Sequence, residues 1–256
     1  MTERLYPIDA GMCSLLTTSY EAGACLELLL SKGSLWRIRS EQRRKIVQDE
    51  QPNMTLLDVL DRAKRLSLKD RLKLAVVLAT ALLHLKDSRW LADDWTKRSV
   101  AFMMLNGAVD VCRPYLASTF PSHAALAVDQ PDLNLLHPSP ALLGLGIMLL
   151  EIGMSTPIEQ ARSEEELVSG NISVNTDLFT AIRVLEQSEG DLHVKYRAAV
   201  HACLRCHFVP MDAAPDFDDE EIRRLVYVNV VQPLEMDLYE GWGVRPDDLW
   251  IHDPIR

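Results

Sequence analysis

Long apolar runs are absent from the sequence: none approaches the roughly 20 residues that a membrane-spanning helix needs. The first residues, MTERLYPIDAG, contain no basic segment followed by an apolar one, so no secretory signal is expected. These two absences predict a cytoplasmic protein without a membrane span. In that compartment the five cysteines are expected to stay reduced.

Positive charge is also scarce. The chain has 27 lysine and arginine residues against 37 aspartate and glutamate residues, which gives a net charge of -10. Such an acidic balance argues against nucleic acid and anionic membranes as the main partners. Basic residues do cluster from Arg37 to Lys45, but Asp49 and Glu50 follow them. A solvated loop therefore explains the cluster better than an anion-binding site.

Motifs for phosphate binding and nucleophilic chemistry are missing as well. The eleven glycines form neither a GxGxxG sequence nor a P-loop. Ser14, Ser118 and His123 do not have the spacing of a nucleophile elbow or a catalytic triad. The 256 residues, 48% of them hydrophobic and 25% charged, suffice for one sizeable core or two small lobes.

Helix-capping residues mark two successive helices. Thr55 and Asp58 match a capping box before a short helix, and Ser67 and Asp70 match a second one before a longer helix. The apolar residues of the longer helix recur at helical spacing: Leu68, Leu72, Ala75, Ala79, Leu82 and Leu83. After this helix, residues 90–102 predict a polar loop that ends in a short apolar strand.

Further apolar patterns complete the expected fold. Two apolar runs between residues 24 and 38, separated by a turn with Gly33, predict a β-hairpin. Ser139 and Pro140 predict the start of a helix that is apolar almost all round, so we expect this helix to be buried at the centre of a lobe. Three more helices are expected at residues 176–187, 192–205 and 218–241. Pro233 is expected to kink or break the last of them.

The stretch 67–102 resembles the long lower-lobe helix and the catalytic loop of protein kinases, in which the loop reads Val-His-Arg-Asp-Leu-Lys-x-x-Asn-Ile-Leu. An alignment without gaps places residues 91–94, Leu-Ala-Asp-Asp, on Val-His-Arg-Asp. Asp94 therefore stands at the position of the catalytic base. Thr96 replaces the Lys, and Ser99 replaces the metal-binding Asn.

Two later segments are compared with kinase elements in the same order. Residues 145–151, Leu-Gly-Ile-Met-Leu-Leu-Glu, resemble the Leu-Gly-Val-x-Leu-x-Glu of the central lower-lobe helix. The Asp that begins this helix in kinases is Ala141 here. No Asp-Phe-Gly, whose Asp binds magnesium in kinases, follows Phe102. Asp110 lies at about the right distance, but Val111 comes next.

Four motifs, taken in order, resemble a fungal domain of unknown function that is related to prion-inhibition and propagation (HeLo-type) proteins. They are Leu-Ser-Leu-x-x-Arg-Leu at residues 66–72, Pro-Tyr-Leu at 114–116, Cys-Leu-Arg-Cys at 203–206 and Val-x-x-Pro-Leu-Glu-x-x-Leu-Tyr at 230–239. The resemblance implies a mainly α fold of the α+β class. Residues 55–256 would form a helical lobe like the carboxyl lobe of a kinase, and residues 1–54 a truncated amino-terminal lobe with a small sheet.

The resemblance and the missing motifs together imply a catalytically inactive kinase-like domain, a pseudokinase, which is not an enzyme and has no cofactor. It would bind a protein partner as an interaction or regulatory module in a fungal cell, with Asp94 as a vestigial base position. Two alternatives stay open. One is a weakly active phosphotransferase that uses Asp94 as its base, and the other is a small-molecule or metal-binding module at Cys203, Cys206 and His207.

The cysteine pair also has a plainer interpretation. The Cys-x-x-Cys-His pattern of residues 203–207 matches c-type haem attachment, which requires export, and a zinc site would need a second pair of ligands. The segment also continues the helix expected at residues 192–205, on its apolar side. Buried and reduced cysteines without a metal are therefore expected here.

Overall fold

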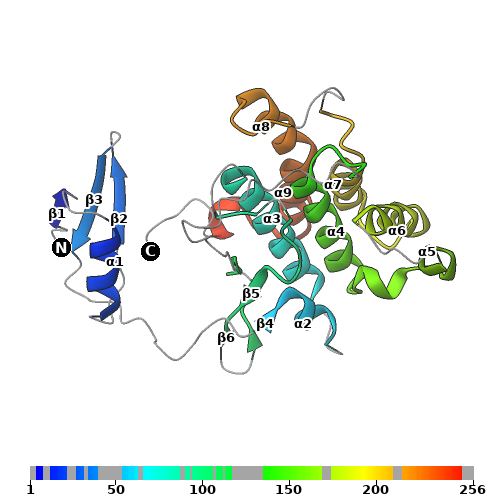
Figure 1. Cartoon of the computed structure of the whole chain (residues 1–256), viewed down its shortest axis with the longest axis horizontal. Helices are drawn as coiled ribbons and strands as arrows, with labels where there is room; N and C mark the ends of the chain where they lie inside the picture. Colours follow the sequence, from blue (N-terminus) through cyan, green and yellow to red (C-terminus); the bar gives the residue numbers. More distant parts are fainter. Residues whose placement is uncertain are drawn as a thin grey trace. The chain divides into compact units, whose positions relative to one another are not determined.

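Two compact units make up the chain: residues 1–51 and residues 52–256 (Figure 1). The computed structural model describes residues 4–7, 12–21, 27–31, 34–39, 54–62, 66–86, 90–92, 94–105, 108–111, 113–116, 135–168, 174–209 and 215–249. Several positions considered above lie outside these ranges: Gly33, Asp93, Ser118, His123 and the basic residues at 43–45.

Among its described residues, the first unit contains a small antiparallel sheet and one helix. In spatial order the sheet consists of β1 (Arg4–Pro7), β3 (Ser34–Arg39) and β2 (Glu27–Ser31), and helix α1 spans Met12–Glu21. Strands β2 and β3 pair from Glu27 opposite Ile38 to Ser31 opposite Ser34. The predicted hairpin is therefore confirmed.

The second unit is mainly helical, as predicted. Its helices are α2 (Leu56–Leu60), α3 (Leu68–Leu85), α4 (Pro140–Met154), α5 (Glu164–Val168), α6 (Val174–Gln187), α7 (Val194–Arg205), α8 (Glu220–Val226) and α9 (Gln232–Trp242). Shorter segments are the 3₁₀ turns η1 (Ile158–Ala161) and η3 (Pro246–Leu249) and the π-helical segment η2 (Tyr227–Val231).

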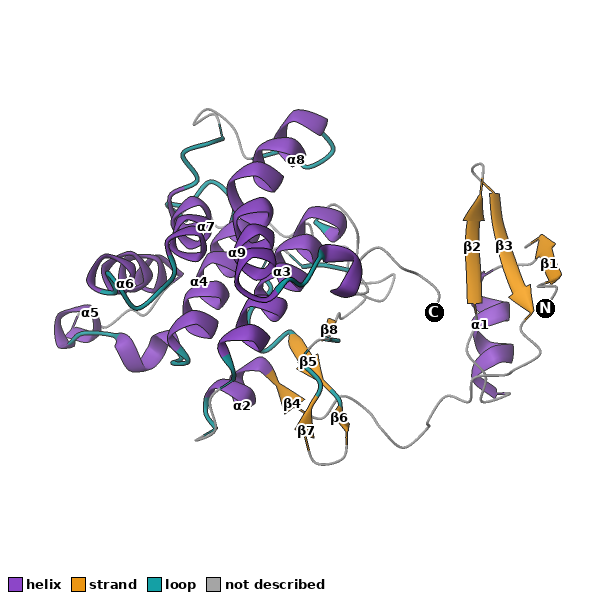
Figure 2. Ribbon diagram, turned by 180° about the vertical axis from the view of Figure 1, so that it is seen from behind, coloured by secondary structure: helices purple, strands orange, loops and turns teal. Residues whose placement is uncertain are grey.

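Short strands lie beside α2 in the second unit (Figure 2). Strands β4 (Met54–Thr55), β5 (Val100–Phe102) and β8 (Tyr115–Leu116) form a three-stranded sheet, and β6 (Met104–Leu105) pairs with β7 (Ala108–Val109). Strand β5 is the apolar strand expected at the end of the polar loop, and all three of its residues are buried. Met54 pairs with Phe102, so it belongs to the second unit and not to the amino-terminal lobe in which we had expected it.

Helix α4 lies at the centre of the second unit, where it packs against α3, α6 and α7 (Figure 1). Ten of its 15 residues are buried, which confirms the prediction of a central helix. Ser139 caps it by accepting a hydrogen bond from the Leu142 amide, and Pro140 lies in its first turn. A Cβ on Gly146 would lie 2.8 Å from the Cβ of Cys203, so the glycine allows α7 to approach closely.

The two predicted capping boxes have different outcomes. Thr55 accepts a hydrogen bond from the Asp58 amide, and the Asp58 carboxylate accepts one from the Thr55 amide at 2.8 Å, so the first box is confirmed. At the start of α3, Ser67 accepts from the Asp70 amide, but the Asp70 carboxylate accepts from the hydroxyl of Ser67. The reciprocal bond of the second box was therefore predicted wrongly, although the helix begins where expected.

Pro233 was expected to kink or break the last helix. The helical stretch runs from Glu220 to Trp242 and does not break at Pro233. In η2 the Gln232 amide donates to the Tyr227 carbonyl, five residues earlier. This wider turn shifts the hydrogen-bond register just before the proline. Pro233 then falls in the first turn of α9, where a proline is tolerated.

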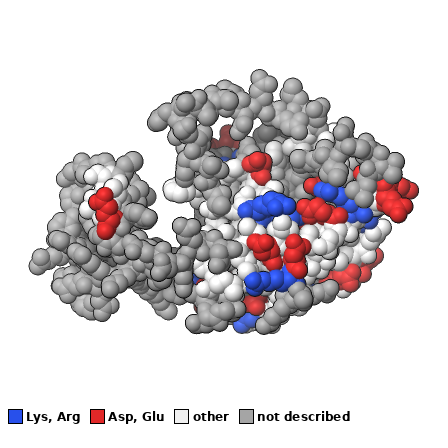
Figure 3. All heavy atoms as spheres, turned by 60° about the horizontal axis from the view of Figure 1, so that its bottom comes forward, with Lys and Arg blue, Asp and Glu red and all other residues white. Residues whose placement is uncertain are grey.

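Charged side chains lie on the surface of the second unit, whereas its core is apolar. Figure 3 shows acidic and basic side chains interspersed on one face of this unit. Apolar side chains fill the core around α4. In the part of the chain that the structure describes, no helix combines the length and the apolarity required to cross a membrane.

Candidate functional site

The segment that resembles a kinase catalytic loop, residues 90–99, contacts the amino-terminal half of α4. The side chain of Trp95 is buried, and its Nε1 donates a hydrogen bond to the Ala141 carbonyl at 2.9 Å. A Cβ on Gly144 would lie 2.6 Å from the Trp95 carbonyl oxygen, so the glycine makes this close contact possible. A backbone carbonyl of α4 thus holds the loop through Trp95.

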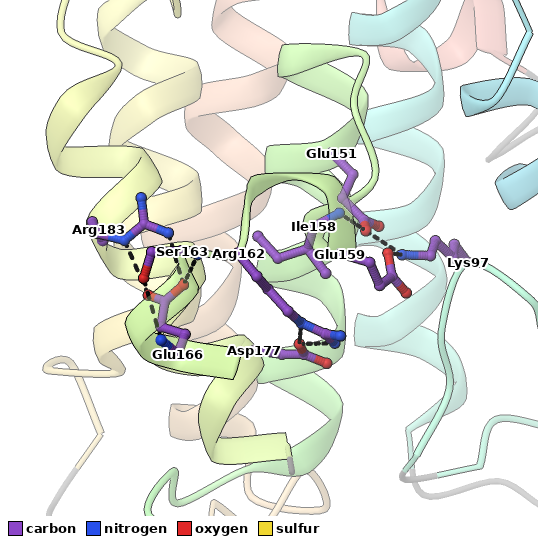
Figure 4. Close-up of polar contacts among 9 residues, drawn as sticks. All are labelled: Lys97, Glu151, Ile158, Glu159, Arg162, Ser163, Glu166, Asp177 and Arg183. Atoms are coloured by element: carbon purple, nitrogen blue, oxygen red, sulfur yellow. Dashed lines mark hydrogen bonds and ion pairs between the residues drawn. The ribbon is translucent and has the colours of Figure 1, made fainter. Parts of the chain in front are cut away.

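Lys97 anchors the loop to the other end of α4. Its side chain is 7% exposed, and its ammonium group contacts the carboxylates of Glu151 in α4 and Glu159 in η1, the second at 2.6 Å (Figure 4). The Ile158 amide donates to the same oxygen of Glu151 at 2.8 Å. One buried cation therefore joins the loop, α4 and η1.

Burial controls the charges in this cluster. It raises the pKa of the Glu151 carboxyl, and the Lys97 ammonium and the Ile158 amide oppose that rise. At Glu159 partial burial acts in the same direction, but the hydrogen bond from Lys97 and other favourable contacts outweigh it, and the pKa is lowered. Glu159 is therefore charged at neutral pH, and the positive charge of Lys97 is used within the cluster.

Two arginines fix the segment after α4 to α6 (Figure 4). Arg162 donates to Asp177 from Nε at 3.1 Å. Arg183 binds both carboxylate oxygens of Glu166, at 3.0 and 2.8 Å, and the Ala161 carbonyl at 2.7 Å. The hydrogen bond from Arg183 lowers the pKa of Glu166 to about 2. The segment that carries η1 is thus tied to a neighbouring helix as well as to the loop.

The loop positions that carry chemistry in kinases have other surroundings here. Asp94 is exposed. The Thr96 hydroxyl accepts from the Arg98 amide at 3.3 Å, and the Ser99 hydroxyl accepts from the Thr96 amide at 3.3 Å. Both hydroxyl groups therefore stabilise the turn of the loop itself. Lys97, two residues before Ser99, points into the core instead of toward Asp94 and the solvent.

Asp110, the residue nearest to the place of the magnesium-binding Asp, lies in a surface ion pair. Its carboxylate is 2.9 Å from Nε of Arg113, three residues later. Among the described residues, no three His, Cys, Asp or Glu side chains are grouped so that they could hold a metal ion.

The Cys-x-x-Cys-His segment is built into the core. Cys203 lies in α7 and is fully buried, whereas Cys206 follows the helix in a left-handed conformation with a φ of 50°. The helix thus ends at Arg205, where it was expected to end. Burial raises the pKa of the Cys203 thiol far above its ordinary value and that of Cys206 to about 11. Both thiols are therefore protonated and packed in the core, whereas His207 is exposed.

Buried polar groups at two places were missed by the sequence interpretation. His137 is buried just before α4, where its Nε2 lies 2.8 Å from the Cys203 carbonyl and its Nδ1 accepts from the Ser139 amide. Burial lowers the pKa of His137, so a neutral imidazole bridges α4 and α7. The Lys97–Glu151 pair was also missed, although a single Glu in the apolar run of α4 is a signal for a buried partner.

The loops described so far are anchored to a central helix. Residues 5–241 of the chain match a family model, Domain of unknown function (DUF7580). The chain belongs to this family. The DUF7580 match covers the sheet of the first unit and nearly all of the helical unit, so the family includes both parts. No curated protein matches the chain.

Proposed function

We propose that this DUF7580 chain is a catalytically inactive kinase-like domain that works as a protein-interaction or regulatory module in the cytoplasm of a fungal cell. The contact that carries the proposal is the burial of Lys97 against Glu151 and Glu159. Phosphoryl transfer depends on positioning and on cations that neutralise the developing charge. A lysine that holds the loop on α4 cannot at the same time face a phosphate group in solvent.

The order of elements supports a relation to the carboxyl lobe of kinases. A capped helix, a loop, a buried strand and a central apolar helix follow one another as in that lobe. The loop is anchored by Trp95 and Lys97, which replace the anchoring Asp of kinases. The relation to HeLo-type proteins belongs to the same proposal and rests on the four sequence motifs.

A phosphotransferase based on Asp94 is the alternative, and the geometry favours it less. A positioned base contributes roughly 100- to 10,000-fold by itself. Here Asp94 is exposed, and the hydroxyl groups of Thr96 and Ser99 bond to the loop backbone. The small-molecule or metal-binding module at Cys203, Cys206 and His207 is also disfavoured, because the thiols of Cys203 and Cys206 are buried.

Exposed apolar side chains on the last helices support the interaction part of the proposal. Met236, Tyr239 and Trp242 are 42%, 50% and 38% exposed, and their spacing of three residues places them on one side of α9. Tyr227 and Val228 in η2 are exposed to a similar extent. Aromatic residues and methionine are enriched in protein interfaces, so this part of the helix is suited to a protein partner.

Radiolabelled phosphate transfer tests the catalytic part of the proposal. Wild-type protein and Asp94→Asn, which is nearly isosteric, are incubated with ATP and either magnesium or manganese. We expect no transfer above the protein-free background, and we expect ATP with magnesium to leave the melting temperature unchanged. Transfer by the wild type that disappears in Asp94→Asn would overturn the proposal and establish the phosphotransferase.

Capture experiments in extracts of the source cells test the interaction part. The double variant Met236→Ser/Tyr239→Ser removes two exposed side chains from α9, and Phe179→Ser removes one of similar exposure from α6. We expect a partner that binds the wild type and Phe179→Ser but not the α9 variant. Equal capture by all three proteins, or no specific capture by the wild type, would contradict the assignment of this surface.

A further inference from the structure

A cavity of about 290 Å³ opens between four helices of the second unit, and none of its lining residues belongs to the loop at 90–99. The lining comes from the first turn of α3, the end of α4, the start of α7 and the end of α9. Apolar and aromatic side chains form much of the wall: Leu68, Leu72, Leu192, Tyr196 and Trp242. The volume is close to the lower end of the range of ligand pockets, about 300–1,000 Å³.

A buried carboxylate lies in this otherwise apolar wall. Asp237 of α9 is 4% exposed, and its Oδ2 accepts a hydrogen bond from the Tyr196 amide at 2.9 Å, in the first turn of α7. Its Oδ1 is in close contact with Nδ1 of His193, at 2.6 Å. A carboxylate oxygen has two acceptor lone pairs, so Oδ1 can accept a further hydrogen bond from a donor in the cavity.

The charges around the cavity favour a positively charged donor. Its acidic lining residues are Asp191, Asp237 and Glu240, and its basic ones are Arg71 and His193. Burial raises the pKa of Asp237, and the nearby imidazole opposes this rise. A positive charge in the cavity next to Asp237 would stabilise the carboxylate.

The arginine in the lining is held by the backbone. Arg71 donates from Nε to the Leu66 carbonyl at 3.0 Å and from Nη1 to the Gly153 carbonyl at 2.9 Å. These bonds join α3 to the end of α4 and use two of the directions in which a guanidinium group can donate. The arginine is therefore a structural part of the wall.

We propose that this cavity binds an organic cation: a protonated amine whose aromatic or aliphatic body fills the apolar part and whose ammonium group donates to Oδ1 of Asp237. The indole of Trp242 at the wall adds a surface on which an aromatic body or a cation is stabilised. This site lies outside the loop, and it shares Trp242 with the exposed side of α9 discussed above. Its function as a ligand site does not depend on whether the domain is a pseudokinase.

Isothermal titration of the full chain with three related probes tests the ligand class. Tryptamine carries an indole body and an ammonium group, tryptophol carries the same body with a hydroxyl group, and indole-3-propionate carries a carboxylate. We expect tryptamine to bind and the other two to bind more weakly by about 30-fold or more, as for the loss of one partner of a buried charge pair. Equal or tighter binding of indole-3-propionate, or no binding of tryptamine at millimolar concentration, would overturn the proposal.

Three variants test the site. Asp237→Asn keeps an oxygen that can accept from the Tyr196 amide but removes the charge, so we expect tryptamine to bind about 30-fold or more weakly. Because Asp237 is buried, a second variant avoids the core: Leu68→Trp enlarges a side chain at the cavity that is 58% exposed and should obstruct the probe. Phe179→Trp, a change on α6 outside the lining, is the matched control and should bind as the wild type does. Tryptamine affinity that is unchanged in both Asp237→Asn and Leu68→Trp would place the probe elsewhere and refute the site.

Discussion

Replacing Lys97 by methionine should destabilise the helical unit strongly at neutral pH. The change removes the ammonium group but keeps a long apolar side chain. It leaves the Glu151 carboxylate, 1% exposed, with the Ile158 amide as its hydrogen-bond donor, while Oε2 has no hydrogen bond among the described residues. Removing one partner of a buried ion pair costs about 3–5 kcal/mol. This is a large share of the roughly 5–15 kcal/mol by which native domains are stable.

The loss of stability should depend on pH in a defined direction. Burial raises the pKa of Glu151 above its ordinary value of 4.5, and without Lys97 the main opposing charge is gone. The folded variant then binds a proton more readily than the unfolded chain, so its stability falls as the pH rises above about 4.5. Well below that pH, Glu151 is neutral in both states. The difference between wild type and variant should therefore be largest at pH 7 and shrink as the pH approaches 4.5.

Urea unfolding followed by far-ultraviolet circular dichroism measures these differences. Arg98→Met is the matched control, because Arg98 is the neighbouring cation and is exposed. The double variant Lys97→Met/Glu151→Leu removes both buried charges and should regain much of the stability that the single variant loses. The reasoning is refuted if Lys97→Met is as stable as Arg98→Met at pH 7, or if the double variant is less stable than Lys97→Met.

Three further outcomes are expected. Leu145→Asp should prevent soluble expression, since it places an unpaired charge on a fully buried position of α4, and a soluble variant that melts cooperatively would count against this. Trp95→Phe leaves the Ala141 carbonyl without its donor and should lower the free energy of unfolding by about 1–3 kcal/mol in urea titrations; no change would contradict the anchoring contact. The Arg183 contact depresses the pKa of Glu166 to about 2. The contribution of this contact to the stability of the fold is therefore complete above pH 4.5 and is lost as the pH falls toward 2. The melting temperatures of wild type and Glu166→Gln should therefore converge between pH 5 and pH 2.5, and a constant difference would exclude this role.

The elements of the fold were largely predictable because their signals are local. Thr55 and Asp58 bond to each other across three residues, and Ser139 with Pro140 begins α4 at the expected place. A kink or a break was predicted at Pro233; the helix does not break there, because a π-helical turn before it shifts the hydrogen-bond register. Nothing in the local sequence around the proline distinguishes such a turn from a kink.

The polar contacts of the candidate site were not predictable in the same way. Lys97 and Glu151 are 54 residues apart, and the sequence of the loop does not show which of its charged residues turns inward. The sequence interpretation directed attention to Asp94, which is exposed. A single glutamate in the apolar run of α4 was the available signal, since a charge at such a position needs a partner.

The sequence by itself determined where helices begin, which of their sides are apolar, and that α4 is surrounded by protein, because capping and periodicity act within a few residues of the chain. Only the tertiary structure decided what the charged groups do. It buried Lys97, left Asp94 at the surface, and placed Asp237 of α9 against the first turn of α7. The energy of a charge depends on its burial and on the partners within a few ångströms, and both follow from segments that are far apart in the sequence.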